Sequence, residues 1–596
     1  MAGYQDRGVD EKMMTRNTII QLFIASSVML SGCAVFDKSP APAPAKAPAP
    51  TKKIVLEKKK LPVRANLPAV NLDADLLFTL LSGEIAGYRG ELGLATGQYL
   101  RAAKQTRDPR VVERAVRVAS YAKLHKEGLE AARLWIEIEP DNQAAKRNLA
   151  SLLLRNDLKA EALAAFDALI KPAKDKEKSF INLGKQLVRE KNRERALELM
   201  QQLVSRYPNV ASAHYVLSSL AEQGGKFALA ESAVRQALVL KGNWTDGQNQ
   251  LARIMHLRGN TLDAIAYLET VLEKSPGNTP IRLSYARLLV DAKQLDKARI
   301  EFEKLSEASP DNADILFALG ILALQSDNLD HAAKYFEKVK NKGRRGLEAS
   351  YYLGQIAEQG KENSKAILHY SRVTRGEYAF DAQLRVARLM AKQGNANAAL
   401  TRLNEMSLRG DAQLVKVTLV EGDILRDEKR YSDAIKGYNK ALEKLPGNTD
   451  LLYARALMAE RVGRIDILMT DLKTILKTEP ENAHALNALG YTLADRTGRY
   501  KEALEYISQA LKLLPNDAAI IDSMGWIQYR LGNYDEALKH LTRAYDLNDD
   551  AEIAAHLGEV LWALGEKTRA RKVWRQGLEQ TPDDEHLIEV IKRFDL

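Results

Sequence analysis

The segment LARIMHLRGNTLDAIAYLETVLEKSPGNTPIRLSYA, residues 251–286, decides the fold of this 596-residue chain. Two small residues, Ala252 and Ala286, lie 34 positions apart in it, and Ala264 follows the first of them by twelve. Antiparallel helices approach closely only where their side chains are small, so this spacing indicates a helix pair. Pro276 then ends the second helix, because proline lacks the N–H that would continue it and clashes with the preceding turn.

The same pattern recurs along most of the chain. The small residues of the first helices are Ala150, Gly184, Ser218, Ala252, Ala286, Gly320, Gly354, Ala387, Gly422, Ala456, Gly490, Gly525 and Gly558. Each is followed twelve residues later by alanine, except that Leu468 follows Ala456 and the interval after Gly490 is thirteen. A period of 34 residues is typical of the tetratricopeptide repeat (TPR). The chain therefore resembles TPR proteins, which implies an all-α fold, a right-handed superhelical solenoid of about thirteen clear repeats.

Five segments follow from this register. Residues 1–32 read as a signal peptide and 33–66 as a tether, 67–140 as degenerate TPR-like helices, 141–582 as the solenoid, and 583–596 as a capping helix. The capping helix is predicted because Leu587, Val590, Ile591 and Phe594 recur at helical spacing with charged residues between them. Terminal repeats of solenoids need such a polar outer cover.

The only cysteine, Cys33, excludes an intramolecular disulfide and a cysteine zinc site. It follows Arg16, an apolar run from Ile19 to Leu30, and the small residues Ser31 and Gly32. The run is too short to span a bilayer but suits an export signal. This stretch resembles the lipobox of bacterial lipoproteins, which implies lipidation of Cys33. Since Ala34 stands where aspartate would favour inner-membrane retention, the resemblance implies an outer-membrane anchor facing the periplasm.

The net charge of +10 resides largely in the tether. Residues 33–66 carry eight positive and two negative side chains, and Ser39–Lys60 is rich in proline, which favours a semi-rigid spacer. A nucleic-acid binder concentrates basic residues on its folded surface, so no nucleic-acid partner is predicted. The basic tether either contacts anionic lipid or peptidoglycan, or serves solubility alone.

Catalytic and cofactor motifs are absent from the sequence, which has no nucleotide P-loop, no HExxH and no GxSxG. We therefore expect no enzyme, no cofactor and no metal site. Nine histidines are scattered over different repeats, and we expect them on the solvated surface. Acid pairs such as Asp549-Asp550 and Asp583-Asp584 fall between helices, where aspartate caps the next helix.

One candidate site lies at the start of the folded chain. Five apolar residues spread over about 200° of a helix, more than one neighbouring helix covers: Leu76, Leu77, Phe78, Leu80 and Leu81. They either dock a partner protein or are covered by residues 61–72 folding back.

A second candidate site lies in the last three repeats. Aromatic and polar residues recur there at positions that face the concave groove of a TPR solenoid: Asn487, Tyr491, Asp522, Trp526, Tyr529, Arg530 and Trp562. Aromatic rings beside asparagine and arginine suit a groove that binds a peptide or protein substrate. The alternative is rigid packing between repeats, since wide rings also fill gaps.

A closer resemblance rests on four stretches: GEIAGYRG at 83–90, TRDPR at 106–110, LNALGYTLAD at 486–495 and DSMGW at 522–526. With residues 553–565 they resemble the LbcA-type lipoproteins. That resemblance implies an outer-membrane adaptor that binds a periplasmic carboxyl-terminal processing protease and presents protein substrates to it, such as cell-wall hydrolases. The alternative is a scaffold of an outer-membrane assembly or exopolysaccharide export complex.

Overall fold

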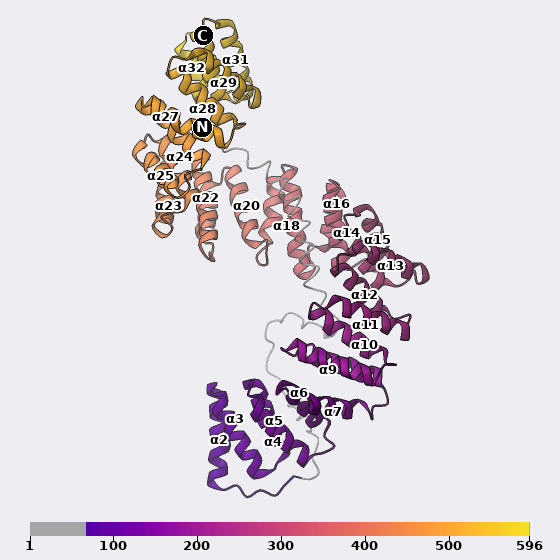
Figure 1. Ribbon diagram of the computed structural model, residues 1–596. Helices are drawn as coiled ribbons and strands as arrows, with labels where there is room; N and C mark the ends of the chain where they lie inside the picture. The colour runs from indigo at the N-terminus through magenta and orange to yellow at the C-terminus, as the bar shows by residue number, and fades with distance from the viewer. Residues whose placement is uncertain (1–66, 595–596) are drawn as a thin grey trace, which may run out of the picture. The chain divides into compact units, whose positions relative to one another are not determined.

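The computed structural model describes residues 67–594, and this part of the chain contains helices and turns but no strand (Figure 1). The predicted signal peptide, the tether and Cys33 lie outside the described residues. The described chain divides at residue 310 into two compact units. We call them the N-terminal unit, residues 67–310, and the C-terminal unit, residues 311–594.

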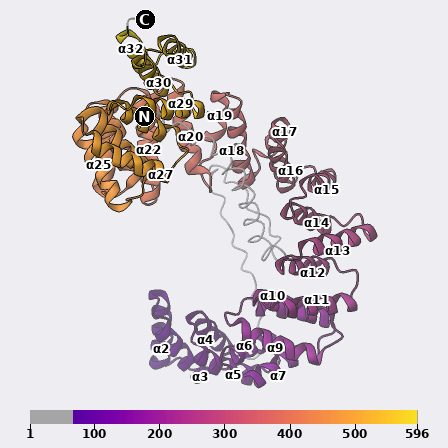
Figure 2. The same ribbon diagram turned by 45° about the horizontal axis from the view of Figure 1, so that its top comes forward.

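The N-terminal unit is a row of helices in which each packs against the next in sequence (Figure 2). Its helices are α2 (Ala74–Arg89), α3 (Leu92–Thr106), α4 (Pro109–Ala122), α5 (His125–Ile138), α6 (Gln143–Arg155), α7 (Lys159–Ile170), α8 (Lys176–Leu187), α9 (Arg193–Arg206), α10 (Ala211–Gln223), α11 (Phe227–Leu240), α12 (Thr245–Leu257), α13 (Thr261–Lys274), α14 (Thr279–Asp291) and α15 (Leu295–Ala308).

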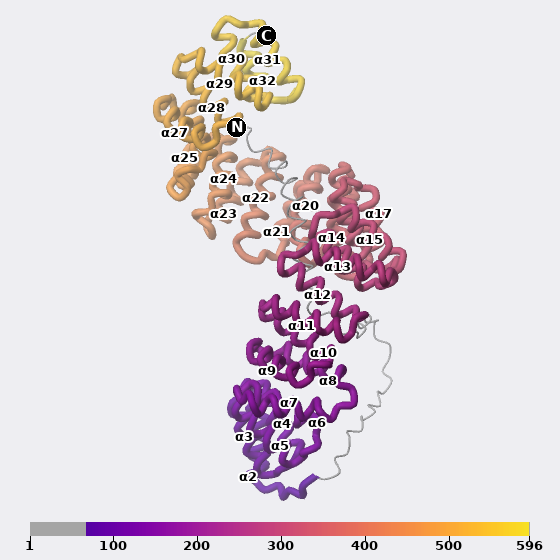
Figure 3. The backbone as a smooth tube through the Cα atoms, turned by 45° about the vertical axis from the view of Figure 1, so that its right-hand side comes forward, coloured from indigo at the N-terminus to yellow at the C-terminus, as the bar shows by residue number. Residues whose placement is uncertain are grey.

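The C-terminal unit continues the same alternation of helices (Figure 3). Its elements are α16 (Ala313–Gln325), α17 (Leu329–Val339), α18 (Gly343–Gln359), α19 (Asn363–Ser371), α20 (Ala379–Lys392), α21 (Ala396–Asn404), α22 (Asp411–Asp427), α23 (Tyr431–Lys444), α24 (Thr449–Arg461), α25 (Ile465–Thr478), α26 (Ala483–Thr492), the π-helix η1 (Leu493–Thr497), α27 (Tyr500–Leu513), α28 (Ala518–Arg530), α29 (Tyr534–Leu547), α30 (Ala551–Ala563), α31 (Lys567–Gln580) and α32 (Glu585–Arg593).

The small residues lie where the sequence places them, on the first helix of each pair from α6 to α31. Ala252 of α12 and Ala264 of α13 are 1% and 0% exposed. At Gly320 of α16, an added Cβ would lie 2.6 Å from the Phe336 ring of α17, so a larger residue cannot fit there without movement. The predicted all-helical repeat fold is confirmed.

Local sequence also sets the helix ends. α13 ends at Lys274, two residues before Pro276, and α27 ends at Leu513, two residues before Pro515. The residue preceding each of these prolines is excluded from the helical conformation by the ring. Within most pairs the turn reverses through a left-handed residue, for example Gly259 with φ 88°.

The repeat that begins at Gly490 carries an extra residue between its two small residues, which the structure absorbs as a π turn. The thirteen-residue interval between Gly490 and Ala503 contains η1, which follows α26 directly. A single π turn lodges one additional residue without breaking the helix, and such turns are frequent at functional sites. As a result, the left-handed turn residue of this pair is Gly498, eight residues after Gly490 rather than seven.

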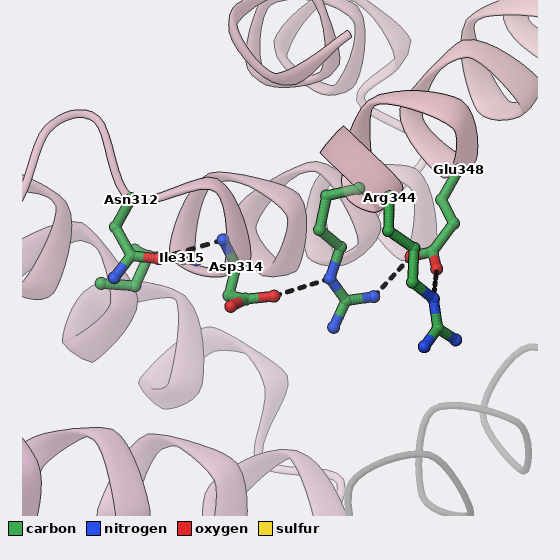
Figure 4. Close-up of polar contacts among 6 residues, drawn as sticks. Asn312, Asp314, Ile315, Arg344 and Glu348 are labelled. Atoms are coloured by element: carbon green, nitrogen blue, oxygen red, sulfur yellow. Dashed lines mark hydrogen bonds and ion pairs between the residues drawn. The ribbon is translucent and has the colours of Figure 1, made fainter. Parts of the chain in front are cut away.

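Polar side chains join the first helices of successive repeats, as at α16 and α18 (Figure 4). Asn312 caps α16 by accepting from the backbone N–H of Asp314 and Ile315 at 3.0 and 3.3 Å. Arg345 of α18 donates to Asp314 at 2.6 Å and pairs with Glu348 at 2.5 Å. Because the Asp314 side chain is 65% exposed, its ion pair with Arg345 contributes little to the free energy of unfolding.

The C-terminal unit coils tightly enough for distant turns to meet. Lys429, in the turn between α22 and α23, forms an ion pair at 2.8 Å with Glu585 at the start of α32, 156 residues away. The first helices of the last repeats lie side by side, α26 against α28 and α28 against α30.

Candidate functional site

The first candidate site is the outward surface of α2. Asp73 caps the helix by accepting from the backbone N–H of Leu76 at 2.7 Å, and Gly90 ends it with φ 81°. Leu76 is only 2% exposed, so its inclusion among the partner-binding residues was wrong. It lies on the same buried stripe as Thr79, Gly83 and Ala86, which packs against α3.

The remaining apolar residues of α2 stay uncovered by the described chain. Leu77, Phe78 and Leu81 are 44%, 66% and 51% exposed, whereas Leu80 is half-buried. Further along, Ile85 and Tyr88 extend the same stripe at helical spacing. We call Leu77, Phe78, Leu81, Ile85 and Tyr88 the α2 outer face.

The alternative to a partner protein was that residues 61–72 fold back over the α2 outer face. Residues 67–72, the described part of that segment, leave the α2 outer face exposed, and Leu67 and Leu72 are themselves 41% and 59% exposed. Residues 61–66 lie outside the described part of the chain. The described structure therefore presents contiguous apolar area at a terminal helix, the usual mark of an interaction surface.

The second candidate site centres on a buried ion pair between two repeats. The Nδ1 atom of His556 on α30 lies 2.9 Å from a carboxylate oxygen of Asp522 on α28. Both side chains are buried, and the Trp526 ring stacks on the His556 ring with centroids 4.2 Å apart. Burial alone lowers the pKa of His556, but the carboxylates of Asp522, Glu552 and Glu559 raise it above its ordinary value.

Tyr491 of α26 completes this group. Its hydroxyl donates to Glu552 of α30 at 3.5 Å, reaching past α28, and its ring lies 6.1 Å from that of His556. Burial raises the pKa of Tyr491 well above its usual value, and the carboxylates of Glu552, Asp495, Asp522 and Glu460 raise it further. We call Tyr491, Asp522, Trp526, Glu552 and His556 the inner cluster.

Two polar atoms beside the inner cluster are buried without a hydrogen-bond partner. They are Oδ1 of Asn487, an acceptor, and Nε1 of Trp526, a donor. Their side chains are 9% and 7% exposed. A buried polar atom left unpaired costs about 1–3 kcal/mol, so such atoms indicate a role beyond packing.

Of the other predicted groove residues, Tyr529 and Arg530 lie beside the inner cluster, whereas Trp562 packs against other aromatic rings. The Tyr529 ring packs against the Trp526 ring at a tilt of 36°, with centroids 5.3 Å apart. Arg530 lies 3.6 Å from Asp495 of η1 and donates to the Tyr500 hydroxyl at 2.8 Å. Trp562 packs elsewhere, with Trp574 at 5.8 Å and Phe594 at 5.4 Å. The structure therefore places Trp562 against Phe594, which follows the capping helix, and apart from the other groove residues.

His556 was missed, since all histidines were expected on the solvated surface, and it is 1% exposed. The spacing could have indicated it: His556 follows Asp522 by 34 residues, close to one repeat period, so the two lie within one residue of the same place on neighbouring first helices. The predicted caps were correct, as Asp550 and Asp584 accept from the backbone N–H of Glu552 and Leu587.

The raised pKa of His556 makes stability depend on pH. The pKa of an unfolded histidine is about 6.5. A histidine with a higher pKa in the folded state stabilises the fold fully at pH values below its unfolded pKa, and this stabilisation is lost as the pH rises through its folded pKa. We expect His556→Gln to destabilise the C-terminal unit by about 1.5–3 kcal/mol near pH 6, the strength of a charged hydrogen bond. Calorimetric unfolding should show this difference from the parent shrinking toward pH 9, and a difference that grows with pH would contradict the assignment.

Between residues 67 and 594 no group of three histidine, cysteine or acidic side chains is placed to hold a metal ion. Nor does any helix of the described chain have the length and apolar character needed to cross a membrane.

Family models described as tetratricopeptide repeat match most of the described chain. They match residues 127–177, 181–247, 256–308, 286–344, 317–382, 481–550 and 523–585, and a tetratricopeptide repeat-like domain matches 356–459.

A full-length relative is TPR repeat-containing protein PA4667 of Pseudomonas aeruginosa, 35% identical over 541 residues, which cover 89% of each chain. Cellulose synthase 2 operon protein C of Komagataeibacter xylinus is 34% identical over 104 residues, 17% of this chain and 8% of that protein. Among solved structures, the APC/C hetero-tetramer Cut9-Hcn1 matches 87% of this chain and 96% of its own at 14% identity, with a TM-score of 0.30.

Proposed function

Because this chain belongs to the tetratricopeptide repeat family, whose members are generally non-catalytic scaffolds for protein interaction, we propose that it is a lipid-anchored adaptor rather than an enzyme. In this proposal it stands on the outer membrane, faces the periplasm, binds a carboxyl-terminal processing protease and presents protein substrates to it. The observation that carries the proposal is the α2 outer face, an apolar surface at the end of the solenoid that no described residue covers.

The two candidate sites suit different partners. The α2 outer face is apolar and suits a stable partner, which is the protease in this proposal. The inner cluster is polar and aromatic and lies within the C-terminal unit, where it suits exchangeable substrates such as cell-wall hydrolases. Holding both proteins on one scaffold raises their effective concentration without new chemistry. The resemblance of residues 83–90 and 486–495 to the LbcA-type lipoproteins supports this assignment.

The proposed anchor is Cys33, the only cysteine of the chain. We expect Cys33→Ser to abolish acylation and to release the protein from the outer membrane, because a single thiol carries the lipid. Fractionation and labelled-palmitate incorporation measure both effects. A Cys33→Ser protein that still incorporates palmitate and sediments with the outer membrane would refute the anchor.

The second candidate function is a scaffold of an outer-membrane assembly or polysaccharide-export complex. The matching segment of cellulose synthase 2 operon protein C favours it, although that segment is 8% of the relative. Affinity purification of the full chain from detergent-solubilised envelopes, with mass spectrometry, separates the two. Recovery of a processing protease supports the adaptor, and stable recovery of a barrel or synthase supports the alternative.

A further inference from the structure

Positive charge in the folded chain is concentrated on α31. The helix carries one acidic residue, Glu579, and five basic residues: Lys567, Arg569, Arg571, Lys572 and Arg575. Residues 67–596 as a whole carry a surplus of only four positive charges, because the tether accounts for six of the ten and residues 1–32 are balanced. This single helix therefore carries a surplus equal to that of the whole folded sequence, the rest of which is neutral in sum.

Four of the five cations have no acidic partner among residues 67–594. Arg569 forms an ion pair with Glu566, but no carboxylate of the described chain forms one with the other four, which are all exposed. These four are Lys567, Arg571, Lys572 and Arg575, and we call them the α31 basic face. Their charges are therefore open to a ligand.

The α31 basic face keeps a repulsion that acidic residues relieve in the preceding second helices. Lys567, Arg571 and Arg575 recur at intervals of four residues, so they lie in one line, about 6 Å apart along the helix axis. Like charges at this spacing destabilise a helix. α27 and α29 place Glu502 and Asp535 in their first turns, whereas the first turn of α31 has no acidic residue. A polar cover for the last described repeat needs no single sign of charge, so the uniform sign indicates a ligand of opposite charge.

Contact with an aromatic ring leaves two of these cations available. Nζ of Lys567 and Cζ of Arg571 lie 4.9 and 5.5 Å from the centroid of the Trp562 ring, and both side chains are exposed. A guanidinium binds a carboxylate through parallel N–H groups at its edge, while its flat face lies against a ring. Arg571 can therefore contact Trp562 and a carboxylate at the same time.

The spacing of the basic face fits an extended polypeptide with acidic side chains on one side. Alternate side chains of an extended chain point the same way and lie about 6.7 Å apart, close to the rise of about 6 Å between successive cations of the line. An anionic membrane is the other candidate. A helix that lies on a membrane buries an apolar face, yet between residues 565 and 594 no large apolar side chain is exposed. The observations therefore favour a protein segment.

We propose that the α31 basic face binds an extended acidic segment of a partner protein, with aspartate or glutamate side chains at alternate positions paired with Lys567, Arg571 and Arg575. Lys572 lies one residue from this line and adds to its positive field. The proposal rests on the scaffold function and names a class of segment that the C-terminal unit accepts. Because the pairs are exposed, binding is weak and reversible, as suits an exchangeable substrate.

The test uses the full chain in non-ionic detergent, without protease or hydrolase. The probes are rhodamine-labelled Gly/Ser dodecapeptides with three glutamates at alternate positions, three consecutive glutamates, three glutamines or three lysines, measured by fluorescence anisotropy. We expect the alternate-glutamate peptide to bind at least tenfold more tightly than the glutamine peptide and threefold more tightly than the consecutive-glutamate peptide at 50 mM salt. Binding should weaken at 300 mM salt, where screening is stronger. Affinity for any of the other three peptides equal to that for the alternate-glutamate peptide would overturn the proposal.

Matched variants locate the binding. Arg571→Gln with Arg575→Gln should weaken the alternate-glutamate peptide at least fivefold. Lys440→Gln with Lys444→Gln makes the same change in net charge at the same spacing on the exposed side of α23 and should leave binding unchanged. Arg571→Lys with Arg575→Lys keeps the charge and should retain binding. A loss in the α23 variant, or in the lysine variant, as large as in the Arg571→Gln, Arg575→Gln variant would contradict the proposal.

The same assay separates a protein segment from a membrane. We expect displacement of the alternate-glutamate peptide to require more phosphatidylglycerol, added to the micelles, than unlabelled peptide. Displacement at a lower concentration of phosphatidylglycerol would show a lipid site and overturn the proposal. Since the protease is absent from the assay, failure of peptide binding leaves the adaptor proposal standing, and failure of the chain to bind the protease leaves this site standing.

Discussion

Gly558→Ala should destabilise the C-terminal unit by about 3 kcal/mol or more, the upper end of the cost of overpacking a core. The added Cβ would lie 2.0 Å from Nε1 of Trp574, a contact that requires the ring or the helix to move. Trp574 is 1% exposed and packs against Trp562 and Phe594 with ring centroids 5.8 and 5.4 Å away, so it has no free space to move into.

The matched control is the same substitution at Gly437 of α23. An added Cβ there has no atom within 4 Å, so Gly437→Ala should stabilise by about 0.5–1 kcal/mol through helix propensity. Urea unfolding followed by tryptophan fluorescence and circular dichroism measures both changes. The N-terminal unit should unfold as in the parent, because each repeat contacts only its neighbours. Equal effects of the two substitutions would contradict the repeat register.

Truncation of the α2 outer face should abolish most of the affinity for the protease. Phe78→Ala with Leu81→Ala removes two large apolar side chains that are 66% and 51% exposed in the described structure. If a partner buries them, each is worth about 1.5–3 kcal/mol, so the double variant should bind at least thirtyfold more weakly. Stability should change little because neither side chain lies in the core.

The control for this variant comes from equally exposed apolar residues elsewhere in the N-terminal unit. Val239 of α11 is 77% exposed and Leu262 of α13 is 66% exposed. The double variant Val239→Ala, Leu262→Ala therefore removes a comparable area of exposed apolar surface. Titration calorimetry with purified protease should show parental affinity for this control. Parental affinity of the Phe78→Ala, Leu81→Ala variant instead would show that the protease docks elsewhere.

The repeat register could be predicted from the sequence because it depends on local steric rules. Small residues mark the closest helix contacts, and prolines end the helices wherever they occur, as Pro276 and Pro515 do. The extra residue after Gly490 was visible as an interval of thirteen, but its conversion into η1 was not. Insertions in helical repeats have several solutions, and only packing against neighbours selects one.

The sites were harder to predict because they depend on which repeats come together. Leu76 and Phe78 are both apolar and two residues apart, yet one is buried and the other exposed, since α3 covers one side of α2. Tyr529 and Trp562 occupy the same place in their repeats, four residues after Gly525 and Gly558, but Tyr529 packs against Trp526 whereas Trp562 packs against Phe594, which follows α32. His556 was overlooked because its partner, Asp522, is a full repeat away.

The central claim is that the chain holds a protease and its substrate together, and the rate of substrate cleavage tests it most directly. Purified protease at nanomolar concentration is mixed with a substrate hydrolase and increasing amounts of the full chain. We predict a cleavage rate that rises, passes through a maximum and falls again, because excess scaffold binds the two proteins on separate molecules. A rate that does not respond to the chain, or cleavage by the chain without protease, would contradict the account.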